Sequence, residues 1–215
     1  MKPYWTKKEN NGSLLLIFNG WGCDENIIQG IDILEYDILI LSDYTELDID
    51  LKSLTAPYSV IKVIAWSFGV YVANLYLQEL PRVVYALAVN GTIHPIDDNV
   101  GIPSSLFQAT LDHYDERFRV KFFRRMMGGN KRLEELAQLL PQRSTEEQRI
   151  ELFEYQQRVE KAQNTICYKW DKIVIGNNDL IFPPSNLINA WKRFDYDCVE
   201  AAHFIPFQKL INQYL

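Results

Sequence analysis

The sequence has few of the residues that build metal centres and disulfide frameworks. It contains three cysteines and three histidines in 215 residues. The cysteines, Cys23, Cys167 and Cys198, are far apart, and none belongs to a C-x-x-C pair. Structural zinc sites need four closely spaced Cys or His ligands, and disulfide frameworks need paired cysteines. We therefore expect no metal, and the unpaired thiols are typical of a reducing compartment.

Excess positive charge and long apolar runs are also missing. The formal net charge is −6, so no overall basic field attracts nucleic acid or an anionic membrane. No run reaches the roughly 18 apolar residues of a membrane-spanning helix. The first residues, MKPYWTKKENNG, are polar, unlike the apolar core of a signal peptide. We expect a cytoplasmic protein that binds neither nucleic acid nor a membrane.

The remaining composition is that of a globular protein, with 47% hydrophobic and 23% charged residues. Short apolar runs alternate with stretches of helical length, which is typical of βαβ units and a parallel sheet covered on both faces. The predicted strands are 13–18, 37–41, 60–65, 83–89, 172–175 and 196–200. The predicted helices between and after them are 24–34, 67–80, 184–194 and 206–214. The sequence predicts an α/β fold in a single domain spanning 1–215.

The middle of the chain, from about 104 to 162, carries helical patterns and no strand pattern. Helices are predicted over 106–113, 116–127, 131–140 and 145–163. Ser144 precedes the last of these, and Glu147 follows three residues later, as in a capping box. We interpret this segment as a helical insertion between two halves of one sheet.

The insertion also contains a block of positive charge. Residues 117–132 include seven basic residues and no acidic one, on a chain that is acidic overall. The block is either a binding surface for an acidic partner or an ordinary solvated helix face. Its members are Arg117, Arg119, Lys121, Arg124, Arg125, Lys131 and Arg132.

The sharpest local signal is Ala65-Trp66-Ser67-Phe68-Gly69, between a predicted strand and a predicted helix. This is the context of a nucleophile elbow, in which a serine stands on a tight turn flanked by small residues. The usual motif begins with Gly, where this chain has Ala65. The alternative is that Ser67 is a plain helix N-cap.

A nucleophilic serine needs a base and an acid, which follow it in the order Asp and then His in this type of site. His203 lies just past the last predicted strand, and Asp179 follows the strand 172–175. Side chains at the carboxyl ends of parallel strands meet at one edge of the sheet. The alternatives are a packed His203 and a simple turn role for Asp179.

Competing residues are less well placed. His94 follows Asn90-Gly91-Thr92 and could lie near the same edge of the sheet, whereas His113 lies in the insertion. Asp171, Asp195 and Asp197 precede or lie inside their strands, at the opposite end of the sheet.

A serine nucleophile of this kind also needs two backbone N–H donors for the oxyanion that develops when it attacks. One is expected from Phe68, the residue after the nucleophile. The other is expected from Trp21, in the turn Asn19-Gly20-Trp21-Gly22 that follows the first predicted strand. Read alone, that motif is equally compatible with an ordinary glycine turn.

Taken together, these motifs resemble the α/β-hydrolases over nearly the whole chain. More narrowly, F-N-G-W-G-C-D, A-W-S-F-G and the G-N-N-D…H-F spacing resemble the BioG-type pimeloyl-[acyl-carrier protein] methyl ester esterases of biotin synthesis. One departure is Asn19, which stands where related esterases commonly have histidine.

The resemblance implies a serine carboxylesterase that uses no cofactor. Ser67, Asp179 and His203 would form its triad, with Trp21 and Phe68 as oxyanion donors. The seven basic residues would contact an acyl carrier protein bearing a methyl-pimeloyl phosphopantetheine thioester. The helical insertion would be a lid, and its apolar residues would line a channel for the acyl chain, unless they form ordinary core. They are Phe107, Phe118, Phe122, Phe123, Met126 and Met127.

Two other functions are compatible with the same residues. One is an acyl-carrier thioesterase or general short-chain carboxylesterase with the same triad. The other is a non-catalytic α/β-hydrolase scaffold that binds a carrier protein. The intact order of serine, aspartate and histidine counts against the second.

Overall fold

The computed structural model describes residues 1–31, 33–162 and 167–215. Its centre is a seven-stranded sheet in the order β1-β3-β2-β4-β5-β6-β7. All neighbouring strands are parallel except β1, which pairs antiparallel with β3 at one edge. The strands are β1 (Lys2–Lys7), β2 (Ser13–Phe18), β3 (Asp37–Ser42), β4 (Val60–Trp66), β5 (Val83–Val89), β6 (Lys172–Gly176) and β7 (Tyr196–Val199).

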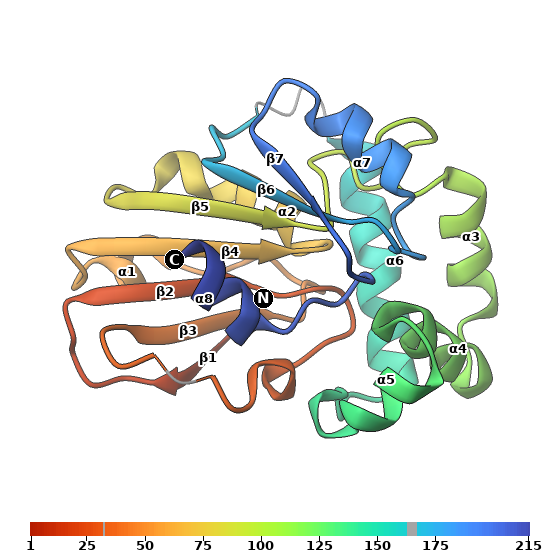
Figure 1. Ribbon diagram of the computed structural model, residues 1–215, viewed down its shortest axis with the longest axis horizontal. Coiled ribbons are helices and arrows are strands. Elements are labelled where there is room, and N and C mark those ends of the chain that lie inside the picture. The colour runs from red at the N-terminus through yellow and green to blue at the C-terminus, as the bar shows by residue number, and fades with distance from the viewer. Residues whose placement is uncertain (32, 163–166) are drawn as a thin grey trace.

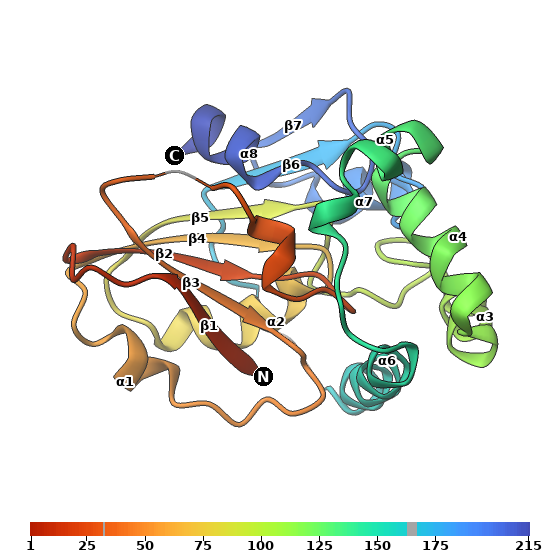
Figure 2. The ribbon, with the colours of Figure 1, turned by 90° about the horizontal axis from the view of Figure 1, so that it is seen from below.

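Helices cover both faces of this sheet (Figures 1 and 2). One face carries α1 (Leu51–Thr55), α2 (Gly69–Tyr76) and α7 (Pro184–Trp191), whose buried side chains join one hydrophobic cluster. The other face carries the 3₁₀ helix η1 (Glu25–Ile28) and α8 (Phe207–Tyr214), which belong to a second cluster. A short 3₁₀ helix, η2 (Leu77–Glu79), continues α2.

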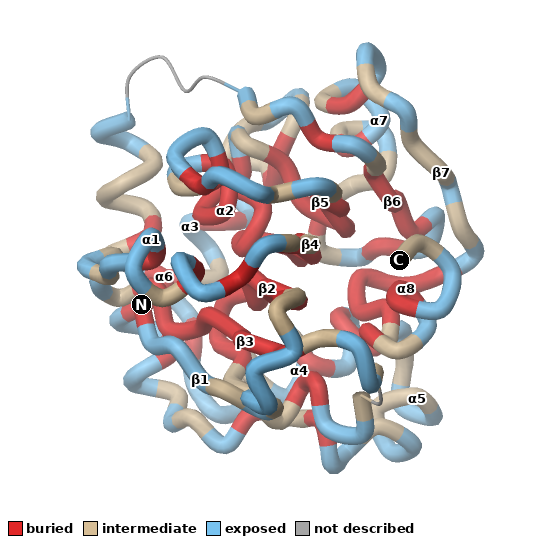
Figure 3. The backbone as a smooth tube through the Cα atoms, turned by 90° about the vertical axis from the view of Figure 1, so that its left-hand side faces the viewer, coloured by how far each residue is buried: buried red, intermediate tan, exposed pale blue. Residues whose placement is uncertain are grey.

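The two clusters arise because side chains of a strand point alternately to opposite faces. In β2, Leu14, Leu16 and Phe18 join the first cluster, whereas Leu15 and Ile17 join the second. The central strands are consequently buried on both sides, as the red tube segments in Figure 3 show. This double burial explains why these strands are continuous apolar runs in the sequence.

A helical insertion separates β5 from β6 and lies beyond the carboxyl ends of the strands (Figure 1). The start of α6 is fixed by the predicted capping box, in which Ser144 and Glu147 each cap the other's backbone N–H. No helix within the described residues is both long and apolar enough to cross a membrane. The elements of the insertion are α3 (Ser104–His113), α4 (Glu116–Met127), α5 (Asn130–Glu135), the 3₁₀ helix η3 (Ala137–Leu139) and α6 (Thr145–Lys161).

Several predicted elements are wrong in extent or kind. The helix expected over 24–34 is only the single 3₁₀ turn η1, and Gly30, at φ +78°, cannot continue a right-handed helix. The predicted helix 131–140 is divided into α5 and η3, and the one over 184–194 ends at Trp191. Residue 32 of the predicted helix 24–34 and residue 163 of the predicted helix 145–163 lie outside the described residues.

Candidate active site

Ser67 stands between β4 and α2 in a strained backbone conformation, with φ +58°. A positive φ is unfavourable for a residue with a Cβ and is found mainly where the surroundings impose it. Here the Ser67 N–H donates to Val89 O on the neighbouring strand at 2.9 Å. The turn therefore lifts the Ser67 side chain above the carboxyl edge of the sheet, as the nucleophile-elbow motif predicts.

Gly69 explains why the motif needs a small residue two positions later. A Cβ on Gly69 would lie 2.3 Å from Phe18 O and 2.4 Å from Asn19 O. Helix α2 can therefore start this close to the end of β2 only with glycine at this position.

The structure brings Ser67, His203 and Asp179 into one hydrogen-bonded chain. His203 Nε2 lies 2.9 Å from Ser67 Oγ, and His203 Nδ1 lies 2.7 Å from Asp179 Oδ2. All three residues are buried. With the proton on Nδ1, the imidazole donates to the carboxylate and accepts from the serine hydroxyl. The N-cap interpretation of Ser67 is wrong, because α2 has Phe68 at its N-cap and no side-chain cap.

The loops after β6 and β7 hold this chain in place. Asp179 also has the turn role considered for it, since its Oδ1 accepts the Ile181 and Phe182 N–H groups at 2.7 and 3.0 Å. The Phe182 ring stacks on the His203 imidazole, with centroids 5.8 Å apart. Trp66 Nε1 donates to the His203 carbonyl at 2.9 Å. These contacts restrict both the carboxylate and the imidazole to one orientation.

The competing residues lie elsewhere. His94 and His113 are exposed, and Asp171 accepts from the Ala86 N–H. Asp195 and Asp197 form ion pairs with a lysine at the start of β6, at the opposite end of the strands.

The backbone amides of Trp21 and Phe68 are available on the Ser67 side of the sheet. Within the described chain neither N–H has a hydrogen-bond acceptor in the protein. Both residues line the same pocket as Ser67 and His203. A Cβ on Gly20 would lie 3.3 Å from the Ser67 Cβ, which places the two turns side by side. The arrangement suits two donors that converge on a developing oxyanion.

The pocket over Ser67 has an empty volume of about 890 Å³, part of which is open to solvent. Phe118, Phe122 and Met126 of α4 and Phe107 of α3 line it, so these four side chains are placed as expected for an acyl channel. Phe123 and Met127 do not line it and are buried in the second hydrophobic cluster. The channel prediction is therefore wrong for these two residues.

The seven basic residues are divided between two environments. Arg117, Lys121, Arg124, Arg125 and Lys131 are exposed, and Arg125 also lines the pocket. Arg132 is half-buried at the start of α5.

Arg119 differs from the other basic residues, because its side chain is only 20% exposed. It donates to the carbonyls of Pro141 and Arg143 at 3.0 and 2.9 Å. Arg119 therefore holds the insertion together and has little freedom to contact a partner.

Sequence reasoning missed Gln148 and Glu151 on α6. Both are fully buried and contact the turn at residues 19–22. Their helix is rich in charge and has a low apolar content, so the pattern gave no sign that these two polar residues face inward.

Known proteins that resemble this chain identify its family and its fold. The family model of the pimeloyl-ACP methyl esterase BioG matches residues 1–211. A crystal structure of BioG from Haemophilus influenzae superposes with a TM-score of 0.89 and 32% sequence identity, covering 97% of this chain and 96% of that one. A lipase-esterase related protein from Clostridium acetobutylicum has a TM-score of 0.67 at 15% identity, which supports the fold alone.

Two sequence relatives were also found. A malonyl-[acyl-carrier protein] O-methyltransferase of Bacteroides fragilis is 36% identical over 194 residues, and this match spans 88% of our chain but only 39% of that protein. An uncharacterized protein of Haemophilus influenzae is 35% identical over 194 residues, covering 89% of this chain and 88% of its own length. The fold is that of an α/β-hydrolase, and the chain belongs to the BioG family of pimeloyl-ACP methyl esterases.

Proposed function

We propose that this protein is a serine carboxylesterase that removes the methyl group from pimeloyl-[acyl-carrier protein] methyl ester in biotin synthesis. The observation that carries the proposal is the hydrogen-bonded chain from Ser67 through His203 to Asp179 at the base of an apolar pocket. Family membership supports ester hydrolysis. The Bacteroides relative is named as a malonyl-[acyl-carrier protein] O-methyltransferase, and this name supports a carrier-linked methyl ester as substrate.

In the proposed reaction, His203 takes the Ser67 proton as the hydroxyl attacks the ester carbonyl. Asp179 keeps the imidazole in the required tautomer and stabilises the imidazolium. The N–H groups of Trp21 and Phe68 donate to the tetrahedral oxyanion. Methanol leaves with the proton from His203, and a water molecule then hydrolyses the acyl-enzyme to release the free carboxylate.

Helix α4 supports the choice of a carrier-bound substrate. It presents Phe118, Phe122 and Met126 to the pocket, while Arg117 and Arg124 are exposed to solvent. An apolar channel suits a methylene chain, and a basic rim suits an acidic carrier protein that delivers it. We therefore interpret the helical insertion as a lid within a single domain, with its exposed basic residues as the carrier contact. The free thiols of all three cysteines are consistent with a cytoplasmic location.

Charge reversal tests the carrier contact. Arg117→Glu and Arg124→Glu are each expected to raise KM for the carrier-linked ester about tenfold at low salt while leaving kcat unchanged. The effect should shrink as salt screens the surface charges. Lys192→Glu is a matched control, because Lys192 is exposed next to α7 and lies outside the insertion. Equal KM values for all three variants would contradict the carrier contact.

The thioesterase alternative is distinguished by the product. The same triad could cleave the carrier thioester, and the mass of the product then reports loss of the whole acyl group rather than of one methyl group. A non-catalytic scaffold would bind the carrier but leave a phosphonate probe unreacted at Ser67.

A further inference from the structure

Two buried polar residues of α6 hold the turn at residues 19–22, here called the oxyanion turn. Gln148 and Glu151 are one helical turn apart, so their side chains leave the same face of α6. Each is 0% exposed. The proposed reaction gives neither of them a role.

Three hydrogen bonds join α6 to the oxyanion turn. The Gly22 N–H donates to Glu151 Oε2 at 3.2 Å, and Gln148 Nε2 donates to Gly22 O at 2.7 Å. The Trp21 indole Nε1–H donates to the Gln148 carbonyl at 2.8 Å. The Gly22 N–H belongs to the peptide that follows Trp21, so these bonds fix both that peptide and the Trp21 ring. Little freedom then remains for the Trp21 N–H itself.

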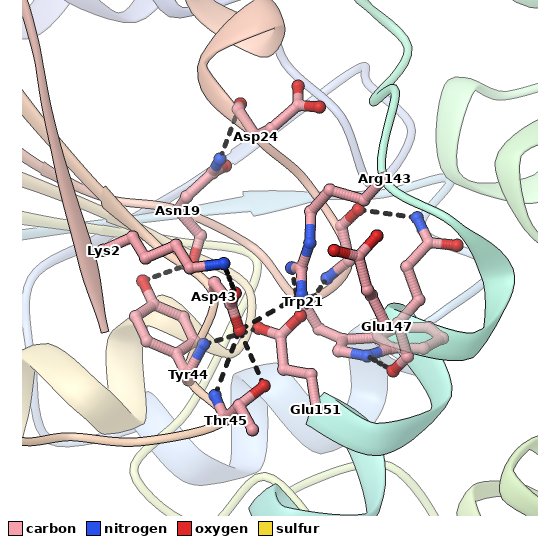
Figure 4. Close-up of polar contacts among 12 residues, drawn as sticks. Lys2, Asn19, Trp21, Asp24, Asp43, Tyr44, Thr45, Arg143, Glu147 and Glu151 are labelled. Carbon is pink, nitrogen blue, oxygen red and sulfur yellow. Dashed lines mark hydrogen bonds and ion pairs between the residues drawn. The ribbon is translucent and has the colours of Figure 1, made fainter.

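The Glu151 carboxylate also reaches the other end of the turn. Its Oε1 accepts the Tyr44 N–H at 2.9 Å. The Tyr44 hydroxyl in turn donates to the Asn19 carbonyl at 2.8 Å. Figure 4 shows these residues gathered between α6 and the strand ends. One carboxylate thus connects the first and last residues of the oxyanion turn, directly to Gly22 and through Tyr44 to Asn19.

Arg143 balances the charge of Glu151. Its Nη1 pairs with Glu151 Oε2, and its Nη2 lies 3.1 Å from Asp43 Oδ1. Burial raises the pKa of Glu151, and the charge of Arg143 and the Tyr44 N–H oppose that shift. A buried ion pair of this kind is often replaceable by apolar residues without loss of stability. Apolar side chains, however, could not hold both polar groups of Gly22.

We propose that Gln148 and Glu151 are positioning residues that aim the Trp21 N–H at the oxyanion of the ester being cleaved. The inference rests on the proposed function, since it assumes that Ser67 attacks an ester and that Trp21 is an oxyanion donor. Because both residues belong to the helical insertion, the insertion then sets the geometry of catalysis as well as the shape of the pocket.

Two variants loosen the turn without touching the triad. Glu151→Gln keeps the shape but provides one accepting oxygen for two N–H groups, Gly22 and Tyr44. Gln148→Met keeps the length but removes the donor to Gly22 O. Arg149→Met is the matched control, because Arg149 also lies on α6 but is exposed and forms its ion pair with Glu146 of the same helix.

The assay is hydrolysis of p-nitrophenyl butyrate, together with the inhibition constant of a trifluoromethyl ketone that adds to Ser67 as a tetrahedral oxyanion. For Glu151→Gln and Gln148→Met we expect kcat to fall about 10- to 100-fold with KM within about threefold, since a displaced donor costs less than a deleted one. The affinity for the ketone should fall by the same factor. Arg149→Met should change neither quantity by more than about twofold.

The inhibition constant of the ketone distinguishes a displaced oxyanion donor from partial unfolding of the variant. Partial unfolding lowers kcat by lowering the amount of active enzyme, but it leaves the inhibition constant unchanged. If Glu151→Gln does not fold, Glu151→Gln combined with Arg143→Met removes both buried charges and serves instead. Folded variants with unchanged kcat, or a fall in kcat without a weaker ketone, would overturn the inference. The proposed function fails differently, through a wild-type protein that neither cleaves the ester nor binds the ketone at Ser67.

Discussion

Replacing Asp179 by asparagine should abolish most turnover while leaving the fold intact. Asp179 Oδ1 accepts two backbone N–H groups, from Ile181 and Phe182, and Oδ2 faces His203 Nδ1 at 2.7 Å. In Asp179→Asn the side-chain oxygen must remain with the two N–H groups, because the amide nitrogen cannot accept from them. The amide nitrogen is thereby turned toward His203.

The consequence is an imidazole with the wrong tautomer. The side-chain amide N–H of the variant donates to His203 Nδ1, so the ring proton moves to Nε2, which can no longer accept from Ser67. A change of tautomer alone lowers kcat by about 10⁴-fold, or about 5 kcal/mol in the activation free energy. Both backbone N–H groups stay paired, so the free energy of unfolding should change by no more than about 1 kcal/mol.

The measurement is kcat for p-nitrophenyl butyrate, with the tautomer read from the ¹⁵N chemical shifts of His203. Asp179→Ala is the comparison, because it leaves two buried N–H groups without acceptors and should destabilise the fold by about 1–3 kcal/mol for each. A folded Asp179→Asn protein that keeps kcat within tenfold of wild type would refute this assignment of the acid.

Four further variants test the surrounding structure, each by urea unfolding. Arg143→Met leaves the buried Glu151 carboxylate without its cationic partner and should lower the free energy of unfolding by about 3–5 kcal/mol. Arg149→Met is the control, because it loses an exposed ion pair and should lower the free energy of unfolding by less than about 1 kcal/mol. Gly69→Ala forces a Cβ against backbone oxygens at the end of β2 and should cost about 1–3 kcal/mol or more. Burial raises the pKa of Asp43, but hydrogen bonds from a lysine and a threonine and a nearby guanidinium outweigh it and lower that pKa to about 2. The Asp43 carboxylate therefore stabilises the fold above the unfolded-state pKa of about 3.9, and this stabilisation is lost as the pH falls to about 2. The free energy of unfolding of Asp43→Asn should be lower than that of wild type by about 1–2 kcal/mol at pH 7. Below a pH of about 2 the two proteins should be equally stable.

The sequence predicted the parallel core strands well, because strands buried on both faces are continuous apolar runs. It missed β1, whose residues are mostly exposed at the sheet edge and carry charge at Lys2 and Lys7. An edge strand needs only one partner and one covered face, so no apolar run marks it. It also overestimated the helix after Cys23, where the local pattern could not reveal that the segment packs as a single 3₁₀ turn.

In the candidate site, too, the residues marked by a local sequence pattern were predicted, and those placed by contacts with distant parts of the chain were missed. The positions of Ser67, Asp179 and His203 follow from a rule that is visible along the chain, since each comes directly after a predicted parallel strand. The inward orientation of Gln148 and Glu151 depends on a turn more than 120 residues earlier in the chain. No local sequence pattern in α6 predicts that contact, so it is seen only in the folded structure.

The proposed reaction is tested most directly by intact-mass analysis of methyl-pimeloyl carrier protein after incubation with the wild-type protein and with Ser67→Ala. We expect loss of one methyl group, with the thioester to the carrier intact, in the wild-type reaction only. Loss of the whole acyl group would identify a thioesterase. A conjugate left unchanged by wild type, or demethylated equally by Ser67→Ala, would contradict the proposed reaction.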